Sequence, residues 1–495
     1  MKHITLHGHF YQPPRDNPWT GVVDAQPTAA PFHDWNARVT AECYAPNAAA
    51  RVLDEHGHEI ARHNNYARMS FNFGPTLLSW LESGDPTTYA AILAADRESI
   101  VAFGHGSALA QAYHHCIMPL ANARDKITQV RWGIADFAHR FGRAPAGMWL
   151  PETAVDLETL HIMAQHQIAF TILTPQQISH IRAPNGTWEP VSATGAPWHR
   201  PYRIALPDNR HIVALCYHEP ISHAVAFEQI LSYAPHFVGR LGAEFDMQCS
   251  EPQLMHIATD GETYGHHHKF GDMALAAALR ELQQTPHITL TNYAAFLEKF
   301  PPTFEARLRE NTSWSCAHGV ERWRSDCGCQ TGGEPGWNQA WRAPLRAALE
   351  WLRDQLTTPF EQTAGKFLRD PWAARDAYID CLLQPNDTTR TEFLQRHAVR
   401  PLTTAESARV FALLELQHNA MRMFTSCGWF FSDVAGIETI QLLRYAGRAI
   451  ELARTHLQID CEPEFVRQLA LIHSNRTDHV SAAALYREWT QNESR

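Results

Sequence analysis

Up to about residue 300 the chain alternates short apolar runs with longer amphipathic ones. Five of the short runs have the length and composition of β-strands, at residues 3–9, 146–152, 168–174, 211–217 and 254–260. Strands that alternate with helical stretches form a parallel sheet or a (β/α) barrel. The alternation therefore predicts an α/β fold, and the polar or acidic residue that ends each run marks a candidate functional position.

The stretches between these runs repeat their apolar residues at helical spacing. In the stretch 125–142 these residues are Ile127, Val130, Ile134, Phe137 and Phe141. A second helical stretch, 156–167, follows the run that ends at Glu152. The proline-rich segment 183–210 predicts an irregular loop or a small hairpin. We expect it to form one side of a site at the strand ends.

The character of the chain changes after about residue 310. Amphipathic helices are predicted at 337–356, 374–383, 407–424 and 436–456, with few strand signals between them. A chain of 495 residues is also long enough for a barrel and a second domain. We predict a (β/α) barrel catalytic domain over residues 1–310 and a C-terminal α-helical domain over residues 311–495.

Charge and composition narrow the class of partner. The formal net charge is -10, whereas nucleic acids and anionic membrane surfaces require a basic face. No run of about 18 apolar residues is present to span a bilayer, and the N-terminus lacks the pattern of a secretory signal. These features predict a cytoplasmic protein with a neutral or polar substrate, no nucleic-acid partner and no membrane partner.

The chain opens with a strand that carries two histidines at alternate positions. Because alternate side chains of a strand share a face, His7 and His9 point the same way. Pro13 and Pro14 stop a central strand soon afterwards. The histidines therefore lie at the carboxyl end of the strand, where α/β folds place their ligand sites. Two half-buried histidines with local hydrogen bonds are the equally open alternative.

Two acidic residues end two other predicted strands. Glu152 follows Pro151 in GMWLPE, and Asp260 precedes Gly261 in HIATDGE. Strand ends of one barrel meet at one mouth, and glycoside cleavage with retention needs two carboxylates roughly 5 to 5.5 Å apart. Taken singly, Glu152 is equally a helix N-terminal acid and Asp260 a turn former. The pair together favours the catalytic interpretation.

A glycine-flanked loop rich in histidine follows Asp260. Glu262 is the competitor of Asp260 for the acid/base role, and we expect it instead to hold a neighbouring His or Arg. His267 either contacts the substrate or is solvated. Further along the chain, Trp314 is a candidate platform on which a sugar ring stacks.

Residues Cys316, His318, Cys327 and Cys329 are of the types that bind zinc. Their spacing lacks the usual C-x₂-C pair, and reduced cysteines packed under a loop are the commoner outcome. The sequence therefore predicts no metal site and no cofactor.

Four blocks in this order, HGHFYQP, FGHGSALAQAYHHCIMPLA, MWLPE and ATDGETYG, resemble glycoside hydrolase family 57, the second family of α-amylase-type enzymes. The resemblance runs from the first residues to about residue 330. It implies an incomplete, seven-stranded (β/α) barrel followed by helices, and retaining chemistry on α-glucans. The C-terminal part resembles a subgroup with an additional helical domain.

Carried onto this chain, the resemblance implies roles for individual residues. Glu152 corresponds to the nucleophile and Asp260 to the general acid/base. His7 and His9 correspond to the pair that hydrogen-bonds the sugar in the −1 subsite, which Trp149 shapes.

The second block departs from the family. Many members carry a G-N-x-E-like stretch where this chain has residues 104–107, GHGS. His105 or Gln111 is expected to take over the polar contact of the missing glutamate.

The sequence thus predicts a retaining hydrolase or transglycosylase on α-1,4-linked glucans or maltooligosaccharides, of the α-amylase or 4-α-glucanotransferase type. Two alternatives stay open: a glucan-binding protein without turnover, and a metal-dependent, deacetylase-like enzyme that uses His7, His9 and Asp260 as ligands.

Overall fold

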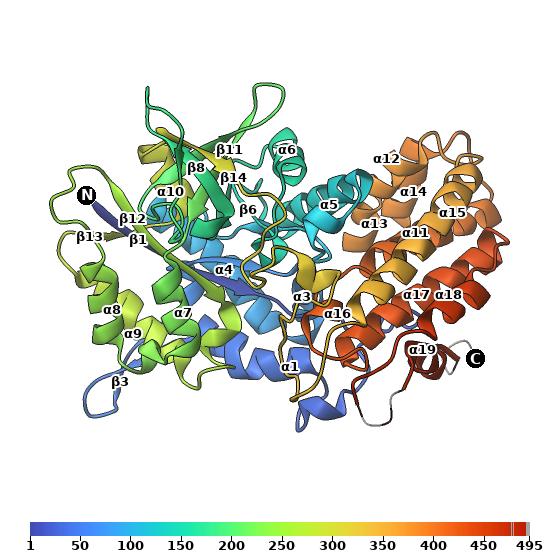
Figure 1. The fold of residues 1–495 in the computed structure, drawn as a ribbon, viewed down its shortest axis with the longest axis horizontal. Helices are drawn as coiled ribbons and strands as arrows, with labels where there is room; N and C mark the ends of the chain where they lie inside the picture. The colour runs from blue at the N-terminus through green and yellow to red at the C-terminus, as the bar shows by residue number, and fades with distance from the viewer. Residues whose placement is uncertain (477, 479, 492–495) are drawn as a thin grey trace. The chain divides into compact units, whose positions relative to one another are not determined.

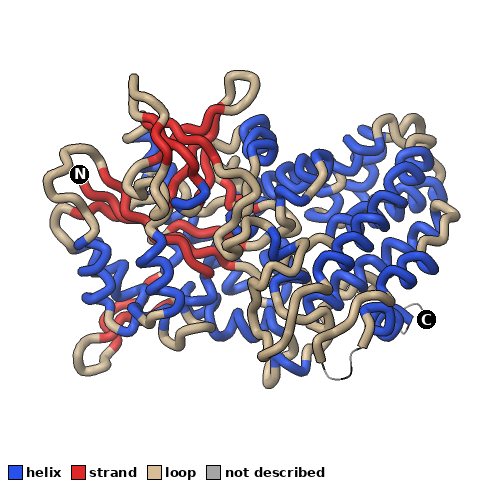
Figure 2. The backbone as a smooth tube through the Cα atoms, viewed as in Figure 1, coloured by secondary structure: helices blue, strands red, loops and turns tan. Residues whose placement is uncertain are grey.

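The computed structural model describes residues 1–476, 478 and 480–491. These residues form two compact units, drawn in Figure 1. The first unit comprises Met1–Gln12, Ala25–Ala112 and Phe137–Trp314, and the second comprises Pro13–Asp24, Tyr113–Asp136 and the chain from Ser315 on. The segments 13–24 and 113–136 thus join the second unit although they lie far from it in sequence. In the described residues, the strands of every sheet belong to the first unit (Figure 2).

The strands of the first unit include all five that the sequence predicts. In chain order they are β1 (Lys2–Phe10), β2 (Ala50–Leu53), β3 (Glu59–His63), β4 (Ser70–Phe73), β5 (Ala110–Gln111), β6 (Met148–Trp149), β7 (Phe170–Leu173), β8 (Ile178–Arg182), β9 (Glu189–Pro190), β10 (Pro201–Ala205), β11 (His211–Cys216), β12 (Gln253–Asp260), β13 (Ile288–Leu290) and β14 (Phe304–Leu308).

Seven parallel strands follow one another around an open ring in the described residues. The order is β12, β1, β4, β5, β6, β7 and β11, joined by strand ladders and by the single bridges Phe71↔Ala108 and Gly147↔Phe170. Between β11 and β12 the described chain forms no ladder, and a backbone hydrogen bond from His218 N to His256 O (2.7 Å) spans the gap. The predicted incomplete (β/α)7 barrel is confirmed.

A second sheet extends the ring on one side. Its order is β7-β11-β10-β14-β8-β9, so it shares β7 and β11 with the barrel. The segment 183–210 lies within it, as the turn between β8 and β9, the strand β10 and the turn into β11. The predicted hairpin is therefore confirmed and is part of a larger sheet.

Helices connect most of the barrel strands. Those in the first unit are α1 (Trp35–Val39), α2 (Ala45–Ala48), α3 (Pro75–Gly84), α4 (Pro86–Phe103), α6 (Leu157–Gln165), α7 (Glu219–Phe227), α8 (Ala234–Ala243), α9 (Gly271–Gln284) and α10 (Tyr293–Lys299). The helix α5 (Ala123–Phe141) covers the predicted stretch 125–142 and spans residues of both units.

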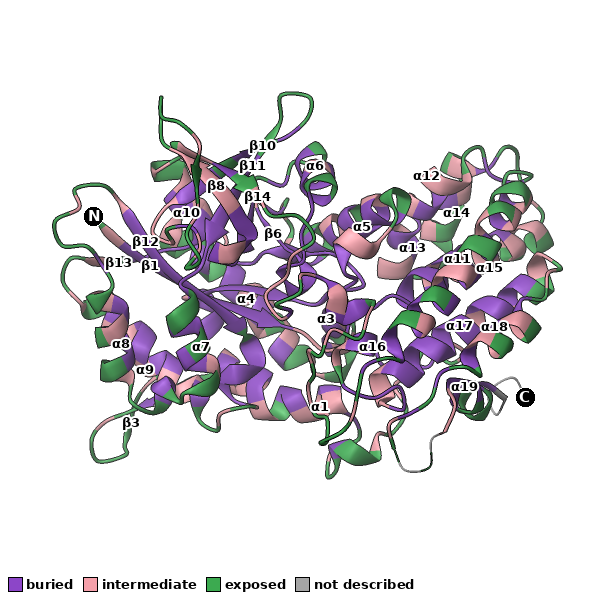
Figure 3. Ribbon diagram, in the orientation of Figure 1, coloured by how far each residue is buried: buried purple, intermediate pink, exposed green. Residues whose placement is uncertain are grey.

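The barrel strands are buried on both faces because helices cover the outside and side chains fill the inside (Figure 3). Residues packed together at the barrel centre are Leu109, Trp149, Phe170, Ile172, Val213, Leu215, Tyr217, Leu254, Ala258, Tyr293 and Phe296. This apolar cluster supports the strand ends from which the candidate site is built.

The second unit is helical in its described residues, as predicted. Its helices after residue 314 are α11 (Arg342–Ala364), α12 (Pro371–Ala377), α13 (Ile379–Leu383), α14 (Asp387–His397), α15 (Thr404–Arg422), α16 (Cys427–Phe430), α17 (Ile437–His456), α18 (Glu462–Leu469) and α19 (Ala482–Gln491). Tyr113 and Trp132 of the inserted segment pack into its core beside Phe360, Leu413 and Phe393. Among the described residues, no helix has both the length and the hydrophobicity required to cross a membrane.

One glycine in the first unit permits a close approach that an added methyl group would block. A Cβ on Gly261 would lie 2.2 Å from Cδ1 of Phe10, which is fully buried. We expect Gly261→Ala to lower the free energy of unfolding by about 1–3 kcal/mol, because Phe10 must leave its packed position. Gly239→Ala is the control, since no atom lies within 4 Å of its Cβ in the middle of α8. Chemical denaturation measures both, and equal stabilities of the two variants would contradict this packing.

Candidate active site

The two N-terminal histidines stack against one tryptophan at the carboxyl ends of β1 and β6. The ring of His7 lies 4.9 Å from that of Trp149 at an interplanar angle of 22°, and the ring of His9 lies 5.0 Å away at 21°. All three side chains are buried, with exposed fractions of 0% for His7 and Trp149 and 3% for His9. The indole therefore fixes the orientation of both imidazoles.

A side-chain amide on β4 connects these histidines to the next strand. Asn72 Oδ1 lies 3.1 Å from His7 Nε2, and Asn72 Nδ2 donates to His9 Nδ1 (2.9 Å) and to Gln111 Oε1 (2.8 Å). Because His9 Nδ1 accepts, the neutral ring carries its proton on Nε2. Burial lowers the pKa of His9 to about 3, against the opposing effect of Asn72, so the ring stays neutral at physiological pH.

His7 has no ring nitrogen left for a sugar in this arrangement. Its Nδ1 lies 3.1 Å from Ser70 Oγ, its Nε2 bonds Asn72, and no part of the side chain is exposed. Burial lowers the pKa of His7 well below its ordinary value, so this ring too is neutral. His7 thus holds Asn72 and Trp149 in place, while His9 is the histidine nearer to the strand end.

Glu152 follows β6 in a strained turn. Its backbone has φ of 57°, and that of Thr153 has φ of 49°, a region that costs about 1–3 kcal/mol for a residue other than glycine. Trp314 binds this turn twice, through its N–H to Glu152 O (3.0 Å) and through its indole Nε1 to Glu152 Oε2 (2.9 Å). The strained turn and the indole together fix the position of the carboxylate.

Asp260 is the last residue of β12, paired in register with His9 of β1. Burial by the surrounding protein and the negative charge of Glu152 raise the pKa of Asp260 to about 7. The side chain is nevertheless open to solvent. The two carboxyl groups therefore interact electrostatically, and Asp260 is the one that retains a proton near neutral pH.

Glu262 follows Asp260 by two residues and is buried. Its Oε1 accepts hydrogen bonds from the backbone N–H of Tyr11 (3.0 Å) and from the Tyr44 hydroxyl. The expectation that it holds a His or an Arg is wrong, because the chain after β1 and the helical segment at Tyr44 present these tyrosine groups instead. Burial and the charge of Asp260 raise the pKa of Glu262 to about 8.

Two of the predicted binding residues lie away from this cluster. His105 precedes β5, at the opposite end of that strand from Gln111, and its Nε2 forms an ion pair with Glu298 Oε2 (3.1 Å). His267 is exposed and lines a surface groove of about 690 Å³, together with Tyr233 and Phe270. His105 and Gln111 are the two residues expected to replace the missing glutamate. In the structure Gln111 is joined to His9 through Asn72, whereas His105 lies elsewhere.

Sequence reasoning missed two residues of the cluster. Asn72 connects three strands, and the alternation of Ser70 and Asn72 within the buried run SFNF was the available signal. Tyr217 ends the predicted strand 211–217. Burial raises its pKa, and neighbouring negative charges, among them that of Asp260, raise it further. Its ring lies 6.4 Å from that of Trp314. A tyrosine that ends an apolar strand gives no distinctive sequence signal.

An incomplete parallel barrel with two interacting carboxyl groups at its strand ends has the architecture of a barrel glycosidase. The sequence model of glycosyl hydrolase family 57 matches residues 11–308. The chain belongs to this family, as the resemblance predicted. A second model, described as a domain of unknown function (DUF3536), matches residues 337–494 in the helical unit.

Solved structures share the fold at low sequence identity. A maltose-forming amylase from Pyrococcus sp. ST04 has a TM-score of 0.71 and 15% identity, over 94% of this chain and 82% of that one. A branching enzyme from Pyrococcus horikoshii has a TM-score of 0.56 and 15% identity, over 100% and 94%. A 4-α-glucanotransferase from Thermococcus litoralis has a TM-score of 0.55 and 14% identity, over 92% and 60%. No curated protein matches the sequence significantly.

The buried carboxyl group of Glu262 makes stability depend on pH. Its pKa in the folded protein, about 8, is above the ordinary 4.5. The stability that depends on a protonated Glu262 is therefore fully present below about pH 4.5, and this part of the stability is lost as pH rises through about 8. We expect Glu262→Gln to gain stability relative to the wild type by about 2–4 kcal/mol between about pH 5 and pH 9.

Denaturation curves at several pH values measure this difference. The exposed Glu98 of α4 serves as the control, and Glu98→Gln should differ from the wild type by the same amount at each pH. A difference between Glu262→Gln and the wild type that does not change with pH would mean that Glu262 is ionised throughout.

Proposed function

We propose that this protein is a retaining enzyme on α-1,4-linked glucans, a hydrolase or transglycosylase that works through a glycosyl ester on Glu152. The family is one of α-glucan hydrolases and transferases. The observation that carries the proposal is that Glu152 and Asp260 come from the ends of different barrel strands and lie close enough for the charge of Glu152 to help raise the pKa of Asp260. Retaining glycosidases use one ionised and one protonated carboxyl group in this way.

In the first step, the Glu152 carboxylate attacks the anomeric carbon while Asp260 donates its proton to the departing glycosidic oxygen. The indole of Trp314 donates to Glu152 Oε2 and holds the carboxylate in a fixed orientation for this attack. The raised pKa of Asp260 keeps it protonated up to about pH 7, the state that a general acid needs.

In the second step, the roles of Asp260 reverse. Burial and the charge of Glu152 together raise the pKa of Asp260, and the second of these causes is gone once Glu152 is a neutral ester. Asp260 then ionises more readily and accepts the proton of the attacking water or sugar hydroxyl. The same interaction therefore supports both the acid and the base function.

The surrounding residues suit a sugar with several hydroxyl groups. His9 is held by Asn72 through Nδ1, so its neutral ring carries the proton on Nε2. Gln111 Nε2 is buried and has no hydrogen-bond partner among the described residues, so the amide is a polar group beside His9 that the protein leaves unsatisfied. Trp149 supports the pocket from below, Trp314 offers an indole beside the carboxylates, and His267 contacts more distant sugar units.

The metal-dependent alternative lacks a ligand set at the strand ends. In residues 1–476, 478 and 480–491, the ligand atoms of His7, His9 and Asp260 do not converge into a group that could hold an ion. Both ring nitrogens of His7 are engaged by protein groups. The binding-protein alternative differs from the proposal in turnover alone, so the experiment below decides between them.

The proposal is tested by incubating a maltooligosaccharide of defined length with the wild type, Glu152→Gln and Asp260→Asn, and reading the products by mass spectrometry. We expect turnover by the wild type and a loss of about a hundredfold to ten-thousandfold in each variant, the usual contribution of a catalytic acid, base or nucleophile. Shorter products alone indicate hydrolysis, and longer products as well indicate transfer.

Glu158→Gln is the matched control, because Glu158 is an exposed acid six residues from Glu152 in sequence. Its activity should equal that of the wild type. Wild-type protein that binds the oligosaccharide without turnover, or a Glu152→Gln variant that is as active as Glu158→Gln, would contradict the proposed function.

A further inference from the structure

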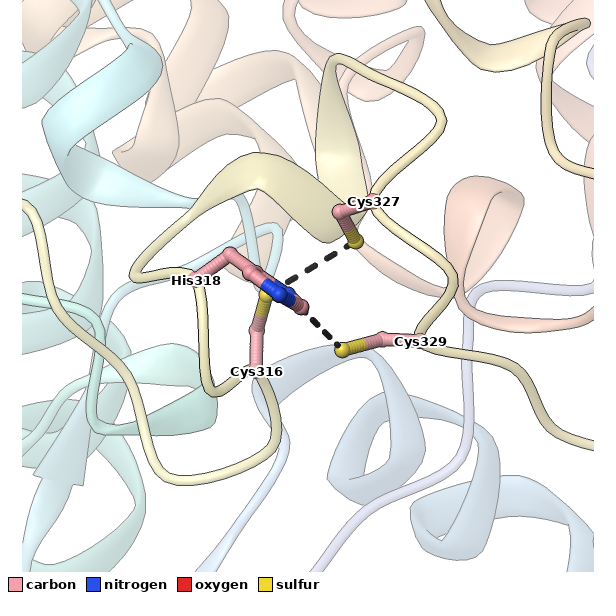
Figure 4. Close-up of side chains that lie close together, drawn as sticks. All are labelled: Cys316, His318, Cys327 and Cys329. Atoms are coloured by element: carbon pink, nitrogen blue, oxygen red, sulfur yellow. Dashed lines mark hydrogen bonds between the residues drawn. The ribbon is translucent and has the colours of Figure 1, made fainter.

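Four potential metal ligands meet in the loop that precedes α11, within the second unit (Figure 4). They are Cys316, His318, Cys327 and Cys329, and their ligand atoms all lie within 4.8 Å of one another. In the sequence they form two pairs, one of the pattern C-x-H and one of the pattern C-x-C. Residues 319–326 separate the two pairs. The fold therefore brings the ligand atoms of both pairs into one cluster.

Two of the distances between the ligand atoms are those of a tetrahedral zinc site. Zinc binds sulfur at about 2.3 Å and nitrogen at about 2.0–2.1 Å, so the edges of a regular tetrahedron are about 3.8 Å between two sulfurs and about 3.6 Å between sulfur and nitrogen. Cys316 Sγ lies 3.9 Å from Cys327 Sγ, and Cys329 Sγ lies 3.6 Å from His318 Nδ1. Both distances match these edges.

The backbone turns so that each pair can point inward. Gly328, between the two cysteines of the second pair, has φ of 83°, and Gly319, directly after His318, has φ of 85°. Both values lie in the left-handed region that glycine adopts without strain. The loop also closes on itself through a hydrogen bond from Gly319 N to Cys316 O (3.1 Å).

Two buried arginines bind the backbone of this loop. Arg342 donates from Nη1 to Cys329 O (2.8 Å), and Arg322 donates from Nη1 to Ser315 O (3.0 Å). In the part of the chain that the structure describes, Arg342 hydrogen-bonds only backbone carbonyl groups and forms no ion pair with a carboxylate. A buried guanidinium of this kind requires negative charge nearby.

The charge of a zinc complex fits this requirement. Three thiolates and one neutral imidazole around Zn²⁺ carry a net charge of minus one, which offsets part of the positive charge of the Arg342 and Arg322 guanidinium groups. Protonated thiols without metal would supply no negative charge beside Arg342. The metal preference follows from the ligands, since three sulfurs and one imidazole in a tetrahedron favour zinc over magnesium, calcium or manganese.

We propose that Cys316, His318, Cys327 and Cys329 bind one zinc ion in a closed, structural site. The four protein ligands fill the tetrahedron, so the ion has no open position for water or substrate and takes no part in the reaction proposed above. Binding releases the three thiol protons and joins the two pairs across the loop. The sequence expectation of reduced cysteines without metal is replaced by this assignment.

The test is the metal content of the full-length protein, purified without chelator and without a metal-affinity step. Inductively coupled plasma mass spectrometry should find about one zinc per chain. After exchange into Co²⁺, the protein should show the visible and thiolate-to-metal charge-transfer bands of tetrahedral cobalt. Zinc at less than about a tenth of an ion per chain after purification and after added zinc, with no cobalt bands, would overturn the proposal.

Two variants separate this site from incidental binding. Cys329→Ser should lower the zinc content at least about tenfold, whereas Cys249→Ser, which removes a partly exposed cysteine of the first unit, should leave it unchanged. If Cys329→Ser is insoluble, the cobalt spectrum of the wild type decides. Equal zinc content in the two variants, an iron–sulfur absorption spectrum, or a Cys316–Cys327 disulfide in protein isolated under reducing conditions would each contradict the proposal.

Discussion

The chemistry proposed for this protein depends on the raised pKa of Asp260, which has two causes, burial and the charge of Glu152. The strand ends of the barrel bring the two side chains close enough to interact, and the protein packed around Asp260 raises its pKa as well, although the residue stays open to solvent on one side. The result is a carboxyl group with a pKa of about 7 beside an acidic group held by an indole. This difference lets two residues with similar side chains take opposite roles at the same pH.

The rest of the site maintains that interaction. Trp149 stacks on both histidines, Asn72 binds them to Gln111, and Trp314 holds the strained turn at Glu152. Most of these groups are buried and neutral, so they contribute rigidity and hydrogen-bond donors without adding charge. Glu262 is the exception, since it adds a second titratable group that interacts electrostatically with Asp260.

Much of the barrel could be predicted from the sequence because its strands are buried on both faces and appear as continuous apolar runs. The candidate catalytic residues could be placed because each directly follows such a run. The exact surroundings could not be predicted, since they depend on contacts between strands distant in sequence. Glu262 receives hydrogen bonds from Tyr11 and Tyr44, and no local pattern around residue 262 indicates those partners.

The four potential zinc ligands show the same limit. The residue types were visible in the sequence, but the geometry depends on how residues 319–326 fold, and that loop has no periodic pattern. Likewise, the degree to which His7 is buried follows from the indole above it and from Ser70 and Asn72 on the neighbouring strand. Alternation in β1 predicts only which face the side chain occupies.

The most direct test of this account is to trap the covalent intermediate. The wild type would be treated with a maltosyl fluoride that carries a second fluorine at C5 of the reacting ring, digested, and mapped by tandem mass spectrometry. The account predicts one added glycosyl group, attached to Glu152. A glycosyl group on Glu262 or Asp260, or turnover of the natural glucan with inversion and no trapped ester, would contradict it.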